Sequence, residues 1–150
     1  MFALRAIREG EQILEYTDEV MSWSRAARRY RRSDETGHTF LFGLGDGRVI
    51  DGGSGGNSTR WLNHACDANC IAVEIEGRVF IEVARDIAIG DELFIDYELM
   101  IDGPRTGEIE QEYACRCGSG RCRRTMLATA TRSPGPCALV PGATWVTWIE

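Results

Sequence analysis

The chain has 150 residues, a length that fits one domain, and 43% of them are hydrophobic, which is enough for a buried core. Its net charge of −6 and isoelectric point near 5.0 argue against general binding to nucleic-acid phosphates. No apolar run approaches the ~18 residues of a membrane span, and the first residues do not resemble a signal peptide. We therefore expect an intracellular protein without direct nucleic-acid or membrane partners.

Short segments of alternating hydrophobicity, separated by turn residues, predict a mostly β fold with short helices. At the start of the chain, residues 2–7 and 12–20 are expected to form two strands around a turn. Apolar residues at helical spacing then predict a helix over 22–32, with Ser22 as its cap. Five arginines lie on the other face of this helix, and they favour a solvated surface over a docking patch for acidic groups.

Two hairpins are predicted in the middle of the chain. Residues 39–44 and 48–51 are joined through an Asp-Gly turn, and residues 70–75 and 78–83 through a Glu-Gly turn. The glycine-rich stretch 52–56 lacks the lysine and the spacing of a phosphate-binding loop. We interpret it as a flexible turn that leads into the polar segment that follows.

Composition divides the last third of the chain. Residues 102–112 are polar and irregular, and they predict a linker. Residues 113–127 contain a compact cysteine cluster. Residues 128–150 hold three of the four prolines and show no usable period, which predicts a disordered tail.

The closely spaced cysteines predict a metal site. Cys115, Cys117 and Cys122 form the pattern C-x-C-x4-C, in which a disulfide between the first two would be strained. Zinc prefers four tetrahedral ligands, so one place remains for another cysteine. The cysteines left for that place are Cys66, Cys70 and Cys137. Cys66 is preferred because it would clamp the cluster over a polar segment, whereas the other two are expected in a buried strand and in the tail.

Residues 60–70 concentrate the chemistry of the chain. They include one of the two histidines, two of the six cysteines, two asparagines, an arginine and a tryptophan. Polar side chains beside an aromatic ring are costly to bury without partners. The composition therefore suits a half-buried loop that grips a polar ligand, without identifying that ligand.

Three motifs stand in one order along the chain: R-W-L-N-H-A-C-D-A-N from Arg60 to Asn69, E-L-F-I-D-Y from Glu92 to Tyr97, and C-x-C-x4-C from Cys115 to Cys122. Together they resemble SET-domain protein lysine methyltransferases with a post-SET zinc element, over roughly residues 1–127. The resemblance implies a β-clip-like fold with a pseudoknot, in which the segment ending at Tyr97 lies beneath the loop of Asn63 and His64.

The same resemblance implies how the chain is divided. The SET domain would occupy residues 1–101, followed by the linker 102–112, the zinc element 113–127 and the tail 128–150. The Gly-x-Gly loop of the family would precede Met1, so it is expected to be missing from the recorded chain.

The resemblance also implies roles for individual residues. Arg60, Asn63 and His64 would hold S-adenosylmethionine. Tyr97 would lie where the methyl group passes to the amine, and Tyr16 would line the channel that admits the lysine. Cys66 would complete the zinc site with Cys115, Cys117 and Cys122, which agrees with the metal-ligand argument above.

The expected function is therefore protein lysine N-methylation, with a basic, lysine-containing protein or peptide such as a histone as the substrate. We expect a monomer that is cytoplasmic or associated with chromosomes or the nucleus. One alternative is a catalytically inactive SET module that serves as a protein-binding scaffold. Another is a zinc-stabilised structural domain without a cofactor, which would leave the Asn63-His64 pair unexplained. All 17 basic residues of the chain are arginine, so the chain has no lysine of its own to modify.

Overall fold

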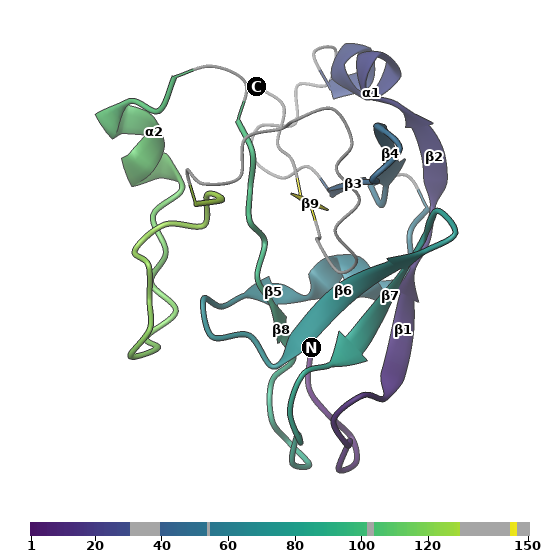
Figure 1. Ribbon diagram of the computed structural model, residues 1–150, viewed down its shortest axis with the longest axis vertical. Coiled ribbons are helices and arrows are strands. Elements are labelled where there is room, and N and C mark those ends of the chain that lie inside the picture. The colour runs from purple at the N-terminus through teal and green to yellow at the C-terminus, as the bar shows by residue number, and fades with distance from the viewer. Residues whose placement is uncertain (31–39, 54, 102–103, 130–144, 147–150) are drawn as a thin grey trace.

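The computed structural model describes residues 1–30, 40–53, 55–101, 104–129 and 145–146. Within these ranges short strands dominate and helices are few, which confirms the mostly β fold (Figure 1). The strands are β1 (Gln12–Tyr16), β2 (Glu19–Ser22), β3 (Leu41–Gly43), β4 (Arg48–Asp51), β5 (Asn63–His64), β6 (Cys70–Ile75), β7 (Arg78–Val83), β8 (Phe94–Ile95) and β9 (Trp145–Val146). The helices are α1 (Trp23–Tyr30), the 3₁₀-helix η1 (Ser58–Trp61) and α2 (Gly107–Glu112).

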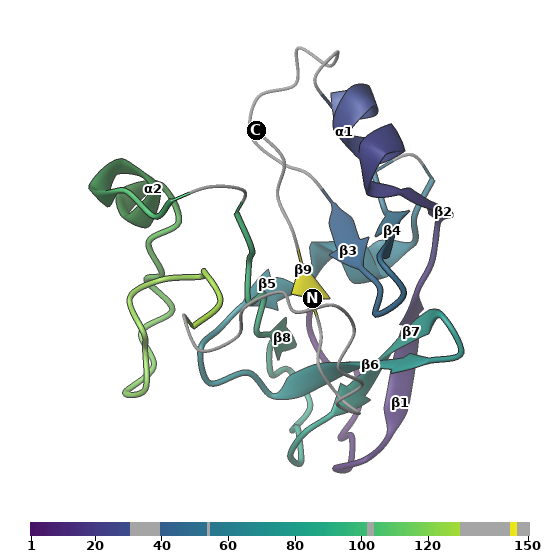
Figure 2. The same cartoon turned by 45° about the horizontal axis from the view of Figure 1, so that its top comes forward.

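The strands form three sheets. One has the order β1-β7-β6, a second has the order β2-β4-β3-β9, and the third is the pair β5-β8. Both predicted hairpins are confirmed, because β3 pairs with β4 and β6 pairs with β7, each antiparallel. In both views, β5 and β8 lie on the side of the first sheet that faces α2 and the cysteine-rich segment after it (Figures 1 and 2).

A shared core joins the three sheets. Val79, Ile81 and Val83 alternate along β7, lie on one face of it and are at most 1% exposed. They belong to one cluster with Ile50 of β4 and Ile95 of β8. Since burying each such side chain contributes about 1.5–3 kcal/mol, this cluster holds the sheets in place relative to one another.

The expected strand 12–20 is divided into two. β1 pairs with β7, whereas β2 pairs with β4 in the other sheet. Between them, the carboxylate of Asp18 accepts hydrogen bonds from the backbone N–H groups of Glu19 and Gly55, at 2.7 Å each. This carboxylate stabilises the turn at which the chain leaves one sheet and enters the next.

The expected strand 2–7 is wrong. Its first and last residues, Phe2 and Ile7, form isolated bridges to Glu92 and Ile87 instead of a ladder. The opposite segment turns between these two points, because the N–H of Asp91 bonds back to the carbonyl of Ala88. A straight strand would therefore have no continuous partner here.

Helix α1 lies where the helical spacing predicts it, and residues 31–32 of that prediction lie outside the described residues. Ala26 is fully buried against a second, smaller core, with Trp23 and Tyr30 packed beside it. Ser22, the expected cap, is the last residue of β2, and its Oγ lies 3.2 Å from that of Ser24.

The arginines of α1 lie on its solvated face, as expected, and two of them also pair with acidic groups of the second sheet. Arg25 and Arg29 each place a guanidinium nitrogen 2.6 Å from Glu19 of β2. Arg29 also lies 2.6 Å from Asp51 of β4, whose side chain is 1% exposed. These pairs anchor α1 to the second sheet.

Two further expectations need correction. Helix α2 lies inside the segment that was expected to be an irregular linker, and Thr106 caps it by accepting the N–H of Ile109 at 3.3 Å. Most of the expected tail lies outside the described residues, but Trp145–Val146 pair with β3, so disorder is wrong for these two. The domain limits themselves stay a prediction. Among the described residues, no helix is long and apolar enough to cross a membrane.

Candidate active site and metal centre

The two central motifs meet in the parallel pair β5-β8. Asn63 lies opposite Phe94, and His64 lies opposite Ile95. This pairing makes the contact that the resemblance implied between the Asn63-His64 loop and the segment ending at Tyr97. Residues 31 positions apart in the chain are thereby held side by side.

Tyr97 is held at both its main chain and its side chain. Its N–H donates to Nδ1 of His64 at 3.1 Å, and its hydroxyl donates to the carbonyl of Leu62 at 2.7 Å. Burial raises the pKa of Tyr97 to about 12. The phenol is therefore neutral at physiological pH, which favours an orienting role over that of a base.

Tyr16 ends β1 inside the same core cluster against which Tyr97 packs. Its side chain is 7% exposed, and its hydroxyl donates to the carbonyl of Phe40 at 2.8 Å. Burial, with the charge of Asp51 second, raises the pKa of Tyr16. The structure thus brings together the two tyrosines that the sequence predicted at the site, both as neutral hydroxyls.

Arg60 lies in η1, directly before the Asn63-His64 pair. Its guanidinium stacks over the ring of Trp61 at 4.8 Å from the centroid, and Nη1 donates to the carbonyl of Gly52 at 3.0 Å. Its Nε is buried without a hydrogen-bond partner among the described residues. A buried donor of this kind suits a polar ligand such as the carboxylate of S-adenosylmethionine.

Asn63 is exposed at the same end of the site. Its amide donates to Oε1 of Glu92 at 2.7 Å, so the first motif is bonded to the first residue of the second. The exposed amide of Asn63 offers a ligand a donor and an acceptor, and Nε of Arg60 offers a further donor. Arg60 and Asn63 therefore fit the cofactor-binding roles predicted for them.

The ring of His64 faces the metal cluster. Its side chain is 4% exposed, and Nε2 lies 3.4 Å from Sγ of Cys66. Burial lowers the pKa of His64, and the nearby Asp96 opposes this effect. Because Nδ1 accepts the Tyr97 N–H, the neutral ring carries its proton on Nε2, toward the sulfur.

The predicted metal ligands converge. The sulfur atoms of four cysteines all lie within 4.8 Å of one another: Cys66, Cys115, Cys117 and Cys122. The sulfurs of Cys66 and Cys115 are 3.6 Å apart. Tetrahedral zinc with Zn–S bonds of ~2.3 Å separates its sulfurs by roughly 3.8 Å, so the cluster fits one zinc ion.

Backbone N–H groups point at these sulfurs. The N–H groups of Cys117, Arg123 and Arg124 each lie 3.4 Å from a cluster sulfur. Backbone hydrogen bonds lower the pKa of Cys117 to about 6, whereas burial raises the pKa of Cys115 to about 12. Such donors stabilise thiolates, which is the ionisation state that binds metal.

One ion pair at this centre was not predicted from the sequence. The guanidinium of Arg123 donates two hydrogen bonds to Asp96, the residue before Tyr97, and the one from Nη2 is 2.7 Å long. Asp96 belongs to the second motif and Arg123 directly follows the third, but no spacing rule relates positions so far apart. A hint was available only in Asp96, because a carboxylate between Ile95 and Tyr97 needs a partner when it is half-buried.

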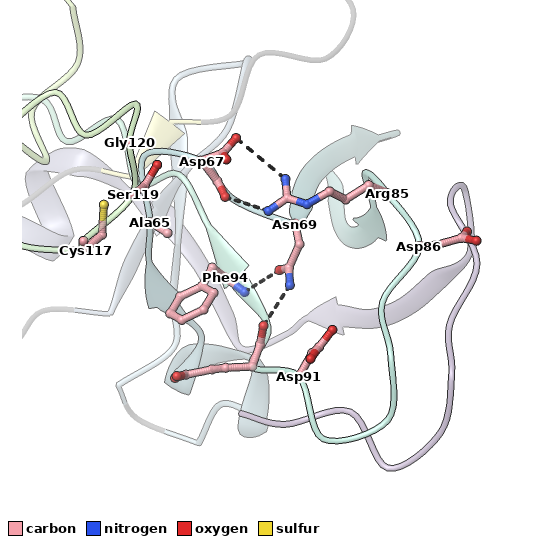
Figure 3. Close-up of a pocket in the computed structure, with 12 residues that line it drawn as sticks. Ala65, Asp67, Asn69, Arg85, Asp86, Asp91, Phe94, Cys117, Ser119 and Gly120 are labelled. Carbon is pink, nitrogen blue, oxygen red and sulfur yellow. Dashed lines mark hydrogen bonds and ion pairs between the residues drawn. The ribbon is translucent and has the colours of Figure 1, made fainter.

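A cavity of about 520 Å³ lies between the loop 65–69, the segment 85–94 and the zinc loop 117–120 (Figure 3). Figure 3 shows the amide of Asn69 between the strands, bonded at 2.8 Å to the N–H of Phe94 and to the carbonyl of Glu92. Arg60, Asn63 and His64 do not line this cavity. It adjoins the candidate cofactor site without containing it.

Comparisons with known proteins agree with this geometry. The family model of the SET domain matches residues 1–98. Histone-lysine N-methyltransferase set1 of Dictyostelium discoideum is 33% identical over 132 residues, which is 84% of this chain and 8% of that protein. Histone-lysine N-methyltransferase, H3 lysine-4 specific, of Saccharomyces cerevisiae is 33% identical over 129 residues, 82% of this chain and 12% of that protein. The chain thus spans a small part of the length of these relatives.

Solved structures are similar as well. The structure of ctPRC2 in an autoinhibited conformation bound to S-adenosylmethionine matches with a TM-score of 0.56 and 34% identity, over 63% of this chain and 13% of that chain. The methyltransferase domain of human histone-lysine N-methyltransferase SETMAR matches with a TM-score of 0.67 over 83% of this chain and 52% of that chain. At 22% identity, this second likeness shows the fold alone. The matched motifs, the fold and the family model together show that this chain belongs to the SET-domain family.

Proposed function

We propose that this SET domain transfers a methyl group from S-adenosylmethionine to a lysine side chain of a histone or another basic protein. The observation that carries the proposal is the joint placement of Tyr16 and Tyr97 in one core, next to the Asn63-His64 pair. The relatives named above are histone-lysine methyltransferases, which supports the same reaction and substrate class. The negative net charge of the chain favours a basic substrate electrostatically.

The residues of the site have distinct tasks in this proposal. When bound, S-adenosylmethionine supplies an electrophilic methyl group on a sulfonium. Arg60, Asn63 and the main chain of His64 hold and orient that cofactor. Tyr97 and Tyr16 present neutral hydroxyls, whose positions are fixed by the carbonyls that accept their hydrogen bonds.

Proton loss from the substrate is favoured by its surroundings. A lysine amine has a reference pKa of ~10.4 and must be neutral before its lone pair can form the new C–N bond. Burial in a narrow channel and the like charge of a neighbouring sulfonium both disfavour the ammonium form. The tyrosines need not accept the proton, and alignment of the reacting atoms supplies most of the acceleration.

The direct test is transfer of a labelled methyl group to a histone mixture, with Tyr97→Phe as the variant. Loss of the hydroxyl should lower kcat about 100-fold, because an aligned dipole at the reacting centre is removed. Tyr113→Phe, in the zinc element, is the matched control and should retain activity. Since the chain has no lysine, any labelled lysine must belong to the added substrate.

The same assay separates the alternatives. Calorimetric binding of S-adenosylmethionine without any transfer would favour the inactive scaffold. Failure to bind the cofactor at all would favour a structural zinc domain. The expected nuclear or chromosomal location, the monomeric state and the lack of direct nucleic-acid contacts stay predictions.

A further inference from the structure

A closed ring of contacts connects the metal cluster to Tyr97. On one side, Sγ of Cys66 lies 3.4 Å from Nε2 of His64, whose Nδ1 accepts the N–H of Tyr97. On the other side, the N–H of Arg123 donates to the same sulfur at 3.4 Å, and its guanidinium binds Asp96. Asp96 directly precedes Tyr97, so both sides of the ring end on the same short segment.

Arg123 is the only member of this ring that reaches the segment of Tyr97 from the zinc element. Its guanidinium and the carboxylate of Asp96 meet as a two-pronged pair, and their side chains are 26% and 27% exposed. Such pairs fix orientation as well as distance, because two parallel hydrogen bonds must be satisfied together. The Nε of Arg123 is buried without a partner among the described residues, so the side chain is held there at an energetic cost.

The position of Tyr97 depends on contacts from outside its own strand. β8 has only two residues and pairs only with β5, so its ladder is short. Beyond β8, the main chain of Tyr97 is held by the ring of His64, and the next backbone tie is at Leu99, which exchanges hydrogen bonds with Met126 and Ala128. A short parallel pair is weakly specified in register, and a second fixed point would remove that freedom.

We propose that Arg123 is a positioning residue, which holds the Asp96–Tyr97 segment in register with the zinc centre and thereby sets the place of the Tyr97 hydroxyl. The proposal rests on the proposed methyl transfer for its catalytic consequence, and on geometry alone for the mechanical link. Arg123 touches neither cofactor nor substrate in this role. It acts through Asp96, and only when Cys66 and Cys122 are held together.

The chain offers a matched control at the next position. The N–H of Arg124 also donates to a cluster sulfur at 3.4 Å, that of Cys122, but its side chain is exposed and makes no ion pair with Asp96. Arg123→Gln and Arg124→Gln therefore remove the same charge from adjacent residues whose N–H groups each donate to a cluster sulfur. They differ in whether the link to Asp96 is lost. Arg123→Lys keeps the charge but cannot form the two-pronged pair, and Asp96→Asn removes the link from the other end.

The first readout needs no activity. The zinc-loaded chain has two histidines, and His38→Gln assigns the ring signals of His64 in a nitrogen-correlated NMR spectrum. Arg123→Gln should shift those signals and speed zinc release to a competing chelator by about tenfold, in the range seen when groups that support metal ligands are removed. Arg124→Gln should change neither, and Arg123→Lys should fall between.

The second readout is the kinetics of methyl transfer. Arg123→Gln should lower kcat about 10- to 100-fold, because a displacement near 1 Å at a reacting centre has effects of this size. The KM for S-adenosylmethionine should change less than about twofold, since Arg60 and Asn63 are untouched. Arg123→Gln and Asp96→Asn together should cost less than the sum of the two single losses, because both break the same link, while Asp96 also lies 3.4 Å from Nδ1 of His64.

The outcomes distinguish this proposal from the proposed function. If the wild-type chain is active and Arg123→Gln matches Arg124→Gln in kcat and in the His64 signals, the positioning role is wrong and the function stands. If the wild-type chain is inactive, the proposed function is wrong, and the positioning role is tested only by the NMR signals of the His64 ring and by the rate of zinc release. A change with Arg123→Gln but not with Arg124→Gln supports the link, and no change overturns it.

Discussion

Tyr16 and Tyr97 satisfy their buried hydroxyls in the same way, by donating to a main-chain carbonyl. The acceptors belong to Phe40 and Leu62, which flank the site from different elements. Because each phenol has its donor bond satisfied, its oxygen lone pairs remain available to a substrate or cofactor group. This arrangement predicts hydroxyls that orient the reacting groups and do not exchange protons with them.

That prediction has a pH signature. Burial raises the pKa of Tyr97 to about 12 and also raises that of Tyr16, so both stay protonated at lower pH. The free lysine substrate loses its proton as the pH rises toward ~10.4, so log(kcat/KM) should rise with a slope near one between about pH 7 and pH 9. Tyr97→Phe should lower the whole profile and keep its slope. A profile that becomes flat in this variant would show that the phenol titrates.

Gly52 is a residue whose lack of a side chain matters for Tyr16. A Cβ at this position would lie 2.6 Å from the Tyr16 hydroxyl oxygen, closer than contact allows. Gly52→Ala should therefore displace the ring, lowering activity at least about tenfold and stability by about 1–3 kcal/mol. Gly107→Ala is the control, because a Cβ there meets nothing within 4 Å and the position opens α2. Equal activity of the two variants would show that the position of Tyr16 does not depend on the lack of a side chain at Gly52.

At the scale of elements, α1 is fixed by a buried carboxylate. Asp51 of β4 is 0% exposed and accepts hydrogen bonds from the hydroxyl of Tyr30, from Arg29 and from the N–H of Gly53, at 2.6, 2.6 and 3.0 Å. The helix and the turn after β4 are thus tied to one point. This turn leads to η1, so the anchor of α1 also positions the start of the cofactor motif.

Asp51→Ala should consequently lower the free energy of unfolding by about 2–3 kcal/mol, because it leaves three donors without their acceptor. Urea denaturation measures this change. Asp46→Ala is the matched control, since the pair of Asp46 with Arg48 is exposed and is worth less than about 1 kcal/mol. Similar midpoints for the two variants would contradict the anchoring role.

The sequence predicted elements well where the determining interactions are local. The two hairpins follow from alternation and from turn dipeptides, and α1 follows from its helical spacing. The strand 2–7 failed because its partner is a turn formed by residues 88–91, which alternation within 2–7 cannot reveal. Helix α2 was missed because its face has no buried residue, so its sequence lacks an apolar stripe.

At the scale of the whole molecule, the motifs predicted which segments lie next to one another. They did not predict the ion pair that holds two of these segments together. Cys66 was assigned to the cluster at 115–122 from ligand chemistry, and the four sulfurs do converge. The pairing of Arg123 with Asp96 joins positions 27 residues apart, and charged residues are too common for such a pair to be recognised without coordinates. A zinc site needs four ligands, so the sequence can predict a distant fourth cysteine. A single ion pair has no such requirement, and the sequence does not predict it.

Removal of zinc tests how far the cysteine-rich segment depends on the metal. Segment 113–129 is tied to the rest of the chain by the cysteines and by backbone bonds around Leu99, including those from Leu99 N–H to Met126 and from Ala128 N–H to Leu99. Without metal, this segment should open while the sheets remain folded, because the core cluster lies within the earlier residues. Chelation should therefore let trypsin cleave the main chain after the arginines of the zinc element, and it should reduce activity at least about tenfold.

Cys66→Ser should reproduce both effects, although Cys66 never touches the methyl group. Cys70→Ala is the matched control, since Cys70 is fully buried in β6 and belongs to no metal cluster, so it should cost only about 1 kcal/mol of stability and retain zinc. Peptide mapping after limited trypsin digestion locates the cuts. Full activity of a metal-free Cys66→Ser protein, or cuts spread evenly over the sheets, would show that zinc does not shape the site through this segment.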